Sequence, residues 1–168
     1  MLSFFKPAYD VGIYGLAYKI LETLVAYPSI YVGLLVPILS RMFISDREAF
    51  FRTTQKAVDM LSFVALPMLF GGAALAAKII PLFGKGYDDA VPTIIILLGA
   101  TSVIFFGTLY ANVLIVVDRQ KTLARIYFWG MLGNIAANLY AIPRWSYIGA
   151  AWTTLFTEVG VTIAMIVL

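Results

Sequence analysis

Residues 91–117 read VPTIIILLGATSVIFFGTLYANVLIVV, a run of 27 residues without a charged side chain. An α-helix rises about 1.5 Å per residue, so about 20 apolar residues cross the hydrocarbon core of a bilayer. The run does not alternate polar and apolar residues as the strands of a membrane barrel do. Its length and composition therefore predict a transmembrane helix.

Comparable apolar runs lie on both sides of this one. Proline residues interrupt some of them, but neighbouring helices can satisfy the backbone groups that a proline frees inside a membrane. The predicted fold class is an all-α, polytopic membrane helical bundle. Its five transmembrane helices are expected over residues 11–39, 60–83, 91–117, 123–142 and 147–168.

The overall composition supports the same class and excludes several functions. Hydrophobic residues make up 62% of the 168 residues and charged residues 12%, against about 45–50% and about 25% in soluble domains. The chain has no histidine and no cysteine, so it offers no imidazole base, thiol nucleophile, disulfide or soft-metal site. A net charge of +3 is small for a nucleic-acid-binding surface. We expect no enzyme, catalytic residue, metal, cofactor or nucleic-acid partner.

Residues 46–58 differ from the apolar runs. Ser45 and Glu48 have the spacing of a capping box, which marks the start of a helix. Apolar and charged residues then alternate with helical periodicity, so the segment is amphipathic. We predict an interfacial helix that lies at the lipid headgroups before the second span; a helix that binds a partner protein is the alternative.

Basic residues predict the orientation in the membrane. Seven lie in or near the connections after the first and third spans, and four lie on the opposite side. By the positive-inside rule, the side with seven faces the cytoplasm. The seven are Arg41, Arg47, Arg52, Lys56, Arg119, Lys121 and Arg125, and the four are Lys6, Lys78, Lys85 and Arg144.

Six short motifs follow one another along the chain. They are DVGIYGLAYKILE (10–22), PILSR (37–41), LFGKGYDDA (82–90), DRQK (118–121), Asn134 with AIP (141–143), and IGAA (148–151) with Thr154. In this order they resemble polysaccharide flippases of the O-antigen and teichoic-acid type, a branch of the multidrug/oligosaccharidyl-lipid/polysaccharide exporter superfamily. Asp118 departs from the family, which often has glycine there.

The resemblance implies a fold and a function. The family fold is two six-helix bundles around a central cavity with alternating access, and the chain resembles part of the carboxyl-terminal bundle. Residues 1–5 then read as the last turn of an earlier span. The resemblance implies flipping of a lipid-linked oligosaccharide across the plasma membrane for surface-polysaccharide synthesis, with a polymerase or ligase as a candidate partner. The alternatives are a drug/cation antiporter of the superfamily and a non-transporting membrane scaffold.

Ionisable residues within spans are the first candidates for function, because each costs about 2.5–3.5 kcal/mol at the helix centre. Lys19 and Glu22 are three residues apart and share a helix face. They are expected either to bind a substrate phosphate and tune its binding, or to form an internal ion pair. Glu158 has no basic neighbour on its helix. It is a candidate for ion coupling, or a structural acid neutralised by another helix.

Polar residues on the fourth predicted span are the second group of candidates. Asn134 and Asn138 are four residues apart and form a polar stripe, which would either line a cavity or bond to a neighbouring helix. Arg125, near the predicted cytoplasmic end, would attract the diphosphate of an incoming lipid. A topology-setting charge explains Arg125 equally well.

Overall fold

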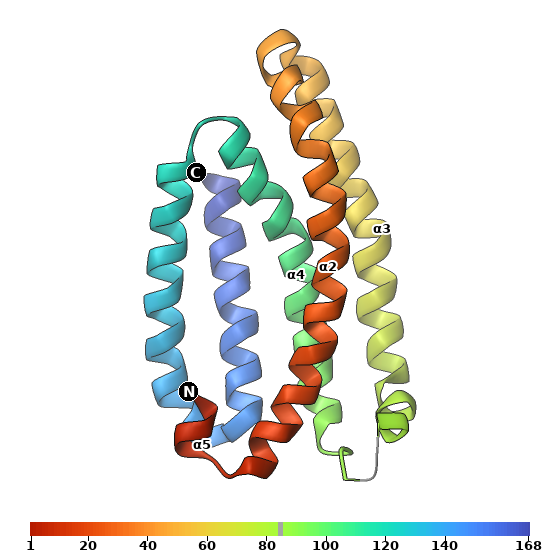
Figure 1. The fold of residues 1–168 in the computed structure, drawn as a ribbon, viewed down its shortest axis with the longest axis vertical. Coiled ribbons are helices and arrows are strands. Elements are labelled where there is room, and N and C mark those ends of the chain that lie inside the picture. The colour runs from red at the N-terminus through yellow and green to blue at the C-terminus, as the bar shows by residue number, and fades with distance from the viewer. Residues whose placement is uncertain (84–85) are drawn as a thin grey trace.

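The computed structural model describes residues 1–83 and 86–168, and within these residues it contains helices and no strand (Figure 1). Gly84 and Lys85, part of the predicted hairpin before residue 91, lie outside the described residues. The all-α prediction is confirmed. The helices are α1 (Leu2–Phe5), α2 (Ala8–Ser45), α3 (Arg47–Ile79), the 3₁₀ helix η1 (Ile80–Phe83), α4 (Ala90–Val116) and α5 (Gln120–Val167).

Helix α5 consists of two antiparallel arms. Its backbone leaves the helical region at Ser146, where φ is 50° and ψ is −133°. Pro143, three residues earlier, lacks the N–H that a continuing helix would need. The arms lie side by side in Figure 1 and correspond to the predicted helices 123–142 and 147–168. Among the described residues, four helices are long and apolar enough to cross a membrane, and the fourth is divided at Ser146 into its two arms.

Residues 46–58 do not form the separate helix that the sequence predicted, while the place of this segment at the lipid headgroups stays a prediction. These residues belong to α3, which continues unbroken from Arg47 to Ile79. Between Arg47 and Pro67 there is no proline or glycine that could interrupt the helix. The apolar face of the amphipathic segment is buried, with Phe50 3% and Ala57 1% exposed. Ala57, Leu61 and Ala65 pack there against Val32 of α2.

The start of α3 also differs from the capping box that the sequence predicted. The Asp46 carboxylate accepts a hydrogen bond from the Ala49 N–H at 2.9 Å, so Asp46 is the N-cap. The Ser45 hydroxyl instead donates to the Arg41 carbonyl at 3.0 Å, within the last turn of α2. With Asp46 as the single linking residue, α2 and α3 form a tight hairpin whose tip projects beyond α4 and α5 in Figure 1.

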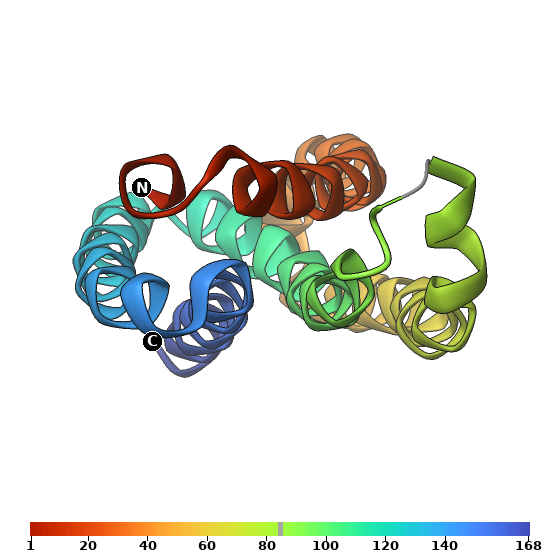
Figure 2. The same cartoon turned by 90° about the horizontal axis from the view of Figure 1, so that it is seen from below.

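Helix α4 is the centre of the bundle. It contacts α2, α3 and α5 and has the largest buried share of the four long helices. Seen from below, α4 lies between the α5 arms and the α2–α3 hairpin (Figure 2). Large apolar side chains on the outside, such as Phe63 and Phe70 on α3, are 76% and 69% exposed. Lipid is the solvent that suits such a surface, and the chain is a multi-pass membrane protein.

The two connections that carry most of the basic residues lie at the same end of the bundle. The α2–α3 connection and the α4–α5 connection are both at the top of Figure 1, and the N-terminus and the Ser146 elbow are at the bottom. The positive-inside rule predicts one orientation for the whole bundle only if the connections rich in basic residues lie at the same end, as they do here. Which end faces the cytoplasm stays a prediction.

Candidate functional site

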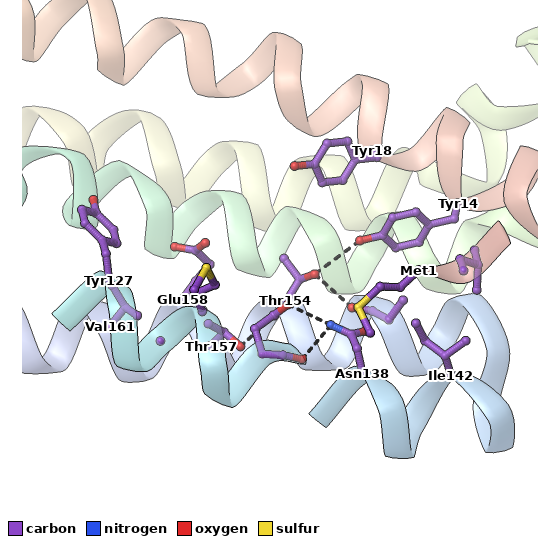
Figure 3. Close-up of a pocket in the computed structure, with 15 residues that line it drawn as sticks. Met1, Tyr14, Tyr18, Tyr127, Asn138, Ile142, Thr154, Thr157, Glu158 and Val161 are labelled. Carbon is purple, nitrogen blue, oxygen red and sulfur yellow. Dashed lines mark hydrogen bonds between the residues drawn. The ribbon is translucent and has the colours of Figure 1, made fainter. Parts of the chain in front are cut away.

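A cavity of about 470 Å³ lies between the first residues of the chain, the start of α2 and both arms of α5 (Figure 3). Polar side chains from three helical segments line it, although the surrounding helices are mainly apolar. We call it the polar cavity. Its polar and aromatic lining residues are Tyr14, Tyr18, Tyr127, Asn134, Asn138, Thr154, Thr157 and Glu158.

The two asparagines that the sequence singled out join the arms of α5. The Asn138 amide donates to the Asn134 side-chain oxygen at 2.9 Å, and the Asn134 amide donates to the Thr157 hydroxyl at 3.0 Å. The Thr153 hydroxyl donates to the Asn138 side-chain oxygen at 2.8 Å. The asparagines therefore form hydrogen bonds between the two arms of α5 and also line the cavity. The two uses considered for them, helix–helix bonding and cavity lining, are compatible.

Tyrosines of α2 form the opposite wall. The Tyr14 hydroxyl lies 3.3 Å from the Thr154 hydroxyl of α5, within hydrogen-bond distance. The rings of Tyr14 and Tyr18 stack, with centroids 5.8 Å apart and an interplanar angle of 24°. Tyr18 is 40% exposed. The wall thus offers an aromatic face and hydroxyl groups, which suit a polar ligand with some apolar surface.

Glu158 is the acidic group of the polar cavity. It lies four residues after Thr154 on the second arm of α5 and is half-buried. Within residues 1–83 and 86–168, no basic side chain comes within 4.0 Å of its carboxylate. In Figure 3 the hydroxyls of Tyr14 and Thr154 point toward each other, and Glu158 lies farther along the cavity, on the side of Tyr127. An acid without a cationic partner in a span is costly unless water or a ligand reaches it.

Lys19 and Glu22 form the ion pair that their spacing predicted, with Lys19 Nζ 3.8 Å from Glu22 Oε2. Their side chains are 79% and 54% exposed, so the pair is not internal to this bundle. They line a second cavity of about 330 Å³, and Tyr14 and Tyr18 line both this cavity and the polar cavity. The ion pair is therefore adjacent to the polar cavity along α2.

Arg125 lies outside the polar cavity. It is exposed and lines a mostly apolar cavity of about 710 Å³ against the arms of α5. This cavity shares Asn134 and Thr157 with the polar cavity but contains neither Glu158 nor Lys19. The structure thus groups Asn134, Asn138 and Glu158 and places the Lys19–Glu22 pair beside them. Arg125 lines a neighbouring cavity, which Asn134 also lines.

The end of the polar cavity near the N-terminus is packed. Leu2 of α1 is buried against Ile142 and Ala150 of α5. The Lys6 ammonium donates to the Pro143 carbonyl at 3.2 Å, and the Ser146 hydroxyl donates to the Asp10 carboxylate. These contacts join the start of α2 to the α5 elbow. They hold together the helices that surround the cavity.

The tyrosines and threonines of the polar cavity were not among the candidate site residues predicted from the sequence. Tyr14, Tyr18 and Glu22 are spaced four residues apart, so they share one face of α2. Thr154 and Glu158 have the same spacing on α5. Polar groups repeating every three or four residues within otherwise apolar spans were the signal that could have identified this face.

The side chains of the polar cavity can bind a ligand through hydrogen bonds. Amide, hydroxyl and carboxylate groups offer hydrogen bonds, and the nearby Lys19 offers a positive charge. Among the described residues, no group of three or more histidine, cysteine or acidic side chains is placed to hold a metal ion. The arrangement suits a polar, hydroxyl-rich molecule.

Comparisons with known proteins identify the family of the chain. A family model described as "Polysaccharide biosynthesis protein" matches residues 4–92, just over half of the chain. The chain is 27% identical over 161 residues to the probable flippase AglR of Haloferax volcanii; the match covers 94% of this chain and 34% of AglR. The chain thus spans about a third of that relative's length. No solved structure matches the chain significantly. The family match confirms the resemblance found in the motifs: the chain belongs to the family of polysaccharide biosynthesis proteins.

Proposed function

We propose that the chain is part of a transporter that flips a lipid-linked oligosaccharide across the plasma membrane by alternating access. The protein is then not an enzyme, because moving the lipid from one leaflet to the other makes and breaks no covalent bond. The observation that carries the proposal is the polar cavity between α2 and the arms of α5. The similarity to a probable flippase supports it.

The physical problem of flipping a lipid-linked sugar matches the properties of this cavity. The sugar hydroxyls and phosphates are strongly hydrated, and burying such groups without partners costs several kcal/mol each. A protein can lower this barrier by offering polar partners across the membrane while the lipid tail stays in the bilayer. The amide, hydroxyl and carboxylate groups of the cavity are partners of this kind.

Each candidate residue has a distinct proposed role. Asn134 and Asn138 bind sugar hydroxyls, for which their amides offer both donors and acceptors. Lys19 contacts a phosphate and Glu22 tunes its charge. Glu158 couples transport to a proton or cation that neutralises its carboxylate. Arg125, near the basic end, attracts the diphosphate of lipid approaching from the cytoplasm.

Alternating access requires that the cavity be closed on one side at a time. The packed end near α1 and the α5 elbow is the outer side in the predicted orientation. The structure then corresponds to a state closed to the outside. The hydrogen bonds of Lys6 and Asp10 would break when that side opens.

The same proposal implies membrane lipid and a polysaccharide-processing enzyme as partners of the protein. The bilayer supplies the lipid that carries the substrate. A polysaccharide polymerase or ligase would use the sugar after it is flipped, so either is a candidate partner.

Transport assays of neutral variants test the proposal. We expect Lys19→Gln and Glu158→Gln to lower the rate of lipid-linked oligosaccharide translocation at least tenfold in the native membrane, with unchanged protein levels. The matched controls Lys56→Gln and Asp59→Asn remove one charge each from α3, outside the cavities described above. They should keep near-normal rates.

Two results would contradict the proposal. Normal translocation in both Lys19→Gln and Glu158→Gln would remove the cavity and its neighbouring ion pair from the mechanism. An equal loss in the controls would indicate a general effect of charge on the protein rather than a role of the cavity.

A further inference from the structure

A separate cavity of about 510 Å³ lies at the opposite end of the bundle from the α5 elbow. It is formed where the tip of the α2–α3 hairpin faces the end of α4 and the start of α5. None of its lining residues lines the polar cavity. We call it the end groove. Its lining residues are Phe43, Arg47, Phe50, Phe51, Val113, Leu114, Val117, Arg119 and Leu168.

The end groove contains two positive charges and no acidic side chain. The Arg47 guanidinium lies 3.8 Å above the centroid of the Phe43 ring, a cation–π contact that restrains its position. The Arg119 guanidinium donates to the backbone oxygen of Leu168, which also lines the groove, and a guanidinium has further N–H donors for an anion. The nearest acid in sequence to Arg47, Asp46, is engaged with the Ala49 N–H. The charges of the groove therefore complement an anion.

The rest of the groove is apolar and aromatic. Phe50 packs edge-on against Phe43 and Phe51, with both pairs of ring centroids 5.4 Å apart. Phe51 is 66% exposed beside Arg47. A small soluble anion would leave these rings uncovered, whereas a molecule with a charged head and apolar chains would cover both parts of the groove.

The groove lies level with the end of α4, where the boundary of the membrane is expected. Val117 directly follows the end of α4, the most apolar helix, while the α2–α3 hairpin continues past it. The same end carries most of the basic residues outside the spans, and basic pockets at such boundaries bind anionic headgroups. Lipid headgroups are thus the anions at highest concentration at this level.

We propose that the end groove binds an anionic glycerophospholipid of the bilayer, with its phosphate between Arg47 and Arg119. Its acyl chains lie along Phe51 and Val117. A lipid bound there links the hairpin tip to the α4–α5 connection. This site is independent of the polar cavity, so it does not depend on the proposed transport function.

Lipid binding to the purified, intact protein tests this site. The probes are dioleoylphosphatidylglycerol and dioleoylphosphatidylcholine, added to the detergent-solubilised protein and followed by native mass spectrometry. We expect the phosphatidylglycerol to bind at least tenfold more tightly than phosphatidylcholine. The double variant Arg47→Gln/Arg119→Gln should lose this preference, and Arg47→Lys/Arg119→Lys, which keeps both charges, should retain most of it.

The control variant is Arg41→Gln/Lys56→Gln, which removes two positive charges from the same hairpin but outside the groove. It should keep the preference for phosphatidylglycerol. An equal loss in this control would overturn the proposal, because general surface charge would then explain the binding. Equal binding of the two lipids, or no lipid binding because another protein segment fills the groove, would also overturn it. Displacement of the lipid by millimolar inorganic phosphate would show a phosphate site rather than a lipid site.

Discussion

Asn138 shows how one polar side chain is accommodated among apolar helices. It is 8% exposed, and its amide and carbonyl groups bond to Asn134 and Thr153. Buried polar groups are costly when they lack partners, and here the partners come from both arms of α5. The residue therefore contributes to the α5 hairpin as well as to the cavity wall.

Replacement of Asn138 by alanine should destabilise the hairpin by about 1 kcal/mol, because hydrogen bonds between membrane helices average about 0.6 kcal/mol and Thr153 loses a partner. Unfolding in mixed micelles measures this change. Asn112→Ala is the matched control, since Asn112 donates only to the Thr108 carbonyl of its own helix. A loss in Asn112→Ala equal to that in Asn138→Ala would contradict the interhelical role.

The sequence could predict the residues of the site better than their grouping. The spacing of Lys19 and Glu22 was enough to predict their ion pair, since neighbours on a helix depend only on local geometry. The presence of Glu158 and Tyr14 in one cavity depends on how α5 folds back at Ser146 and packs near α2. Such long-range packing has no local signal, so Arg125 could not be separated from the cavity residues in advance.

At the scale of elements, local signals placed the spans but not all of their ends. Apolar length predicted the five spans, whereas the amphipathic segment 46–58 suggested a separate surface helix. An amphipathic pattern shows that one face is buried but not whether lipid or protein covers it. In this fold Val32 and the neighbouring residues of α2 and α4 cover it, and α3 continues without a break to Ile79.

The N-cap of α3 gives a direct test at this scale. Asp46→Ala removes the hydrogen bond to the Ala49 N–H and should destabilise the protein by about 1 kcal/mol. Ser45→Ala removes only a bond within α2 and should have a smaller effect. Thermal unfolding of both variants measures the difference. A larger effect for Ser45→Ala would restore the capping box that the sequence predicted.

The α5 hairpin depends on a close approach at Gly149. A Cβ atom there would lie 2.7 Å from the Ala141 carbonyl oxygen, and this backbone atom cannot move without distorting the first arm. Gly149→Ala should therefore cost about 1–3 kcal/mol, as overpacking does. Gly133→Ala on the same element meets no atom within 4 Å and should not destabilise. Equal unfolding temperatures for the two variants would contradict this packing.

At the scale of the whole molecule, the bundle has an apolar outside and a polar cavity on one side of α4. The exposed phenylalanines of α3 suit lipid, and the polar wall formed by α2 and α5 suits water or a hydrated ligand. Composition alone was enough to predict the first property, because 62% hydrophobic residues exceed what a soluble domain can bury. The second property needs the three-dimensional arrangement of three helical segments.

Cysteine accessibility in the native membrane tests most directly whether water reaches the polar cavity. The 168-residue chain has no cysteine, so a single cysteine can be introduced at each chosen position, with any cysteine elsewhere in the protein removed. We predict that cysteines at Tyr18 and Thr157, in the polar cavity, react with a membrane-impermeant thiol reagent. Cysteines at Phe63 and Phe70, on the lipid-facing side of α3, should stay unmodified. Cavity cysteines as unreactive as those at Phe63 and Phe70 would contradict the account.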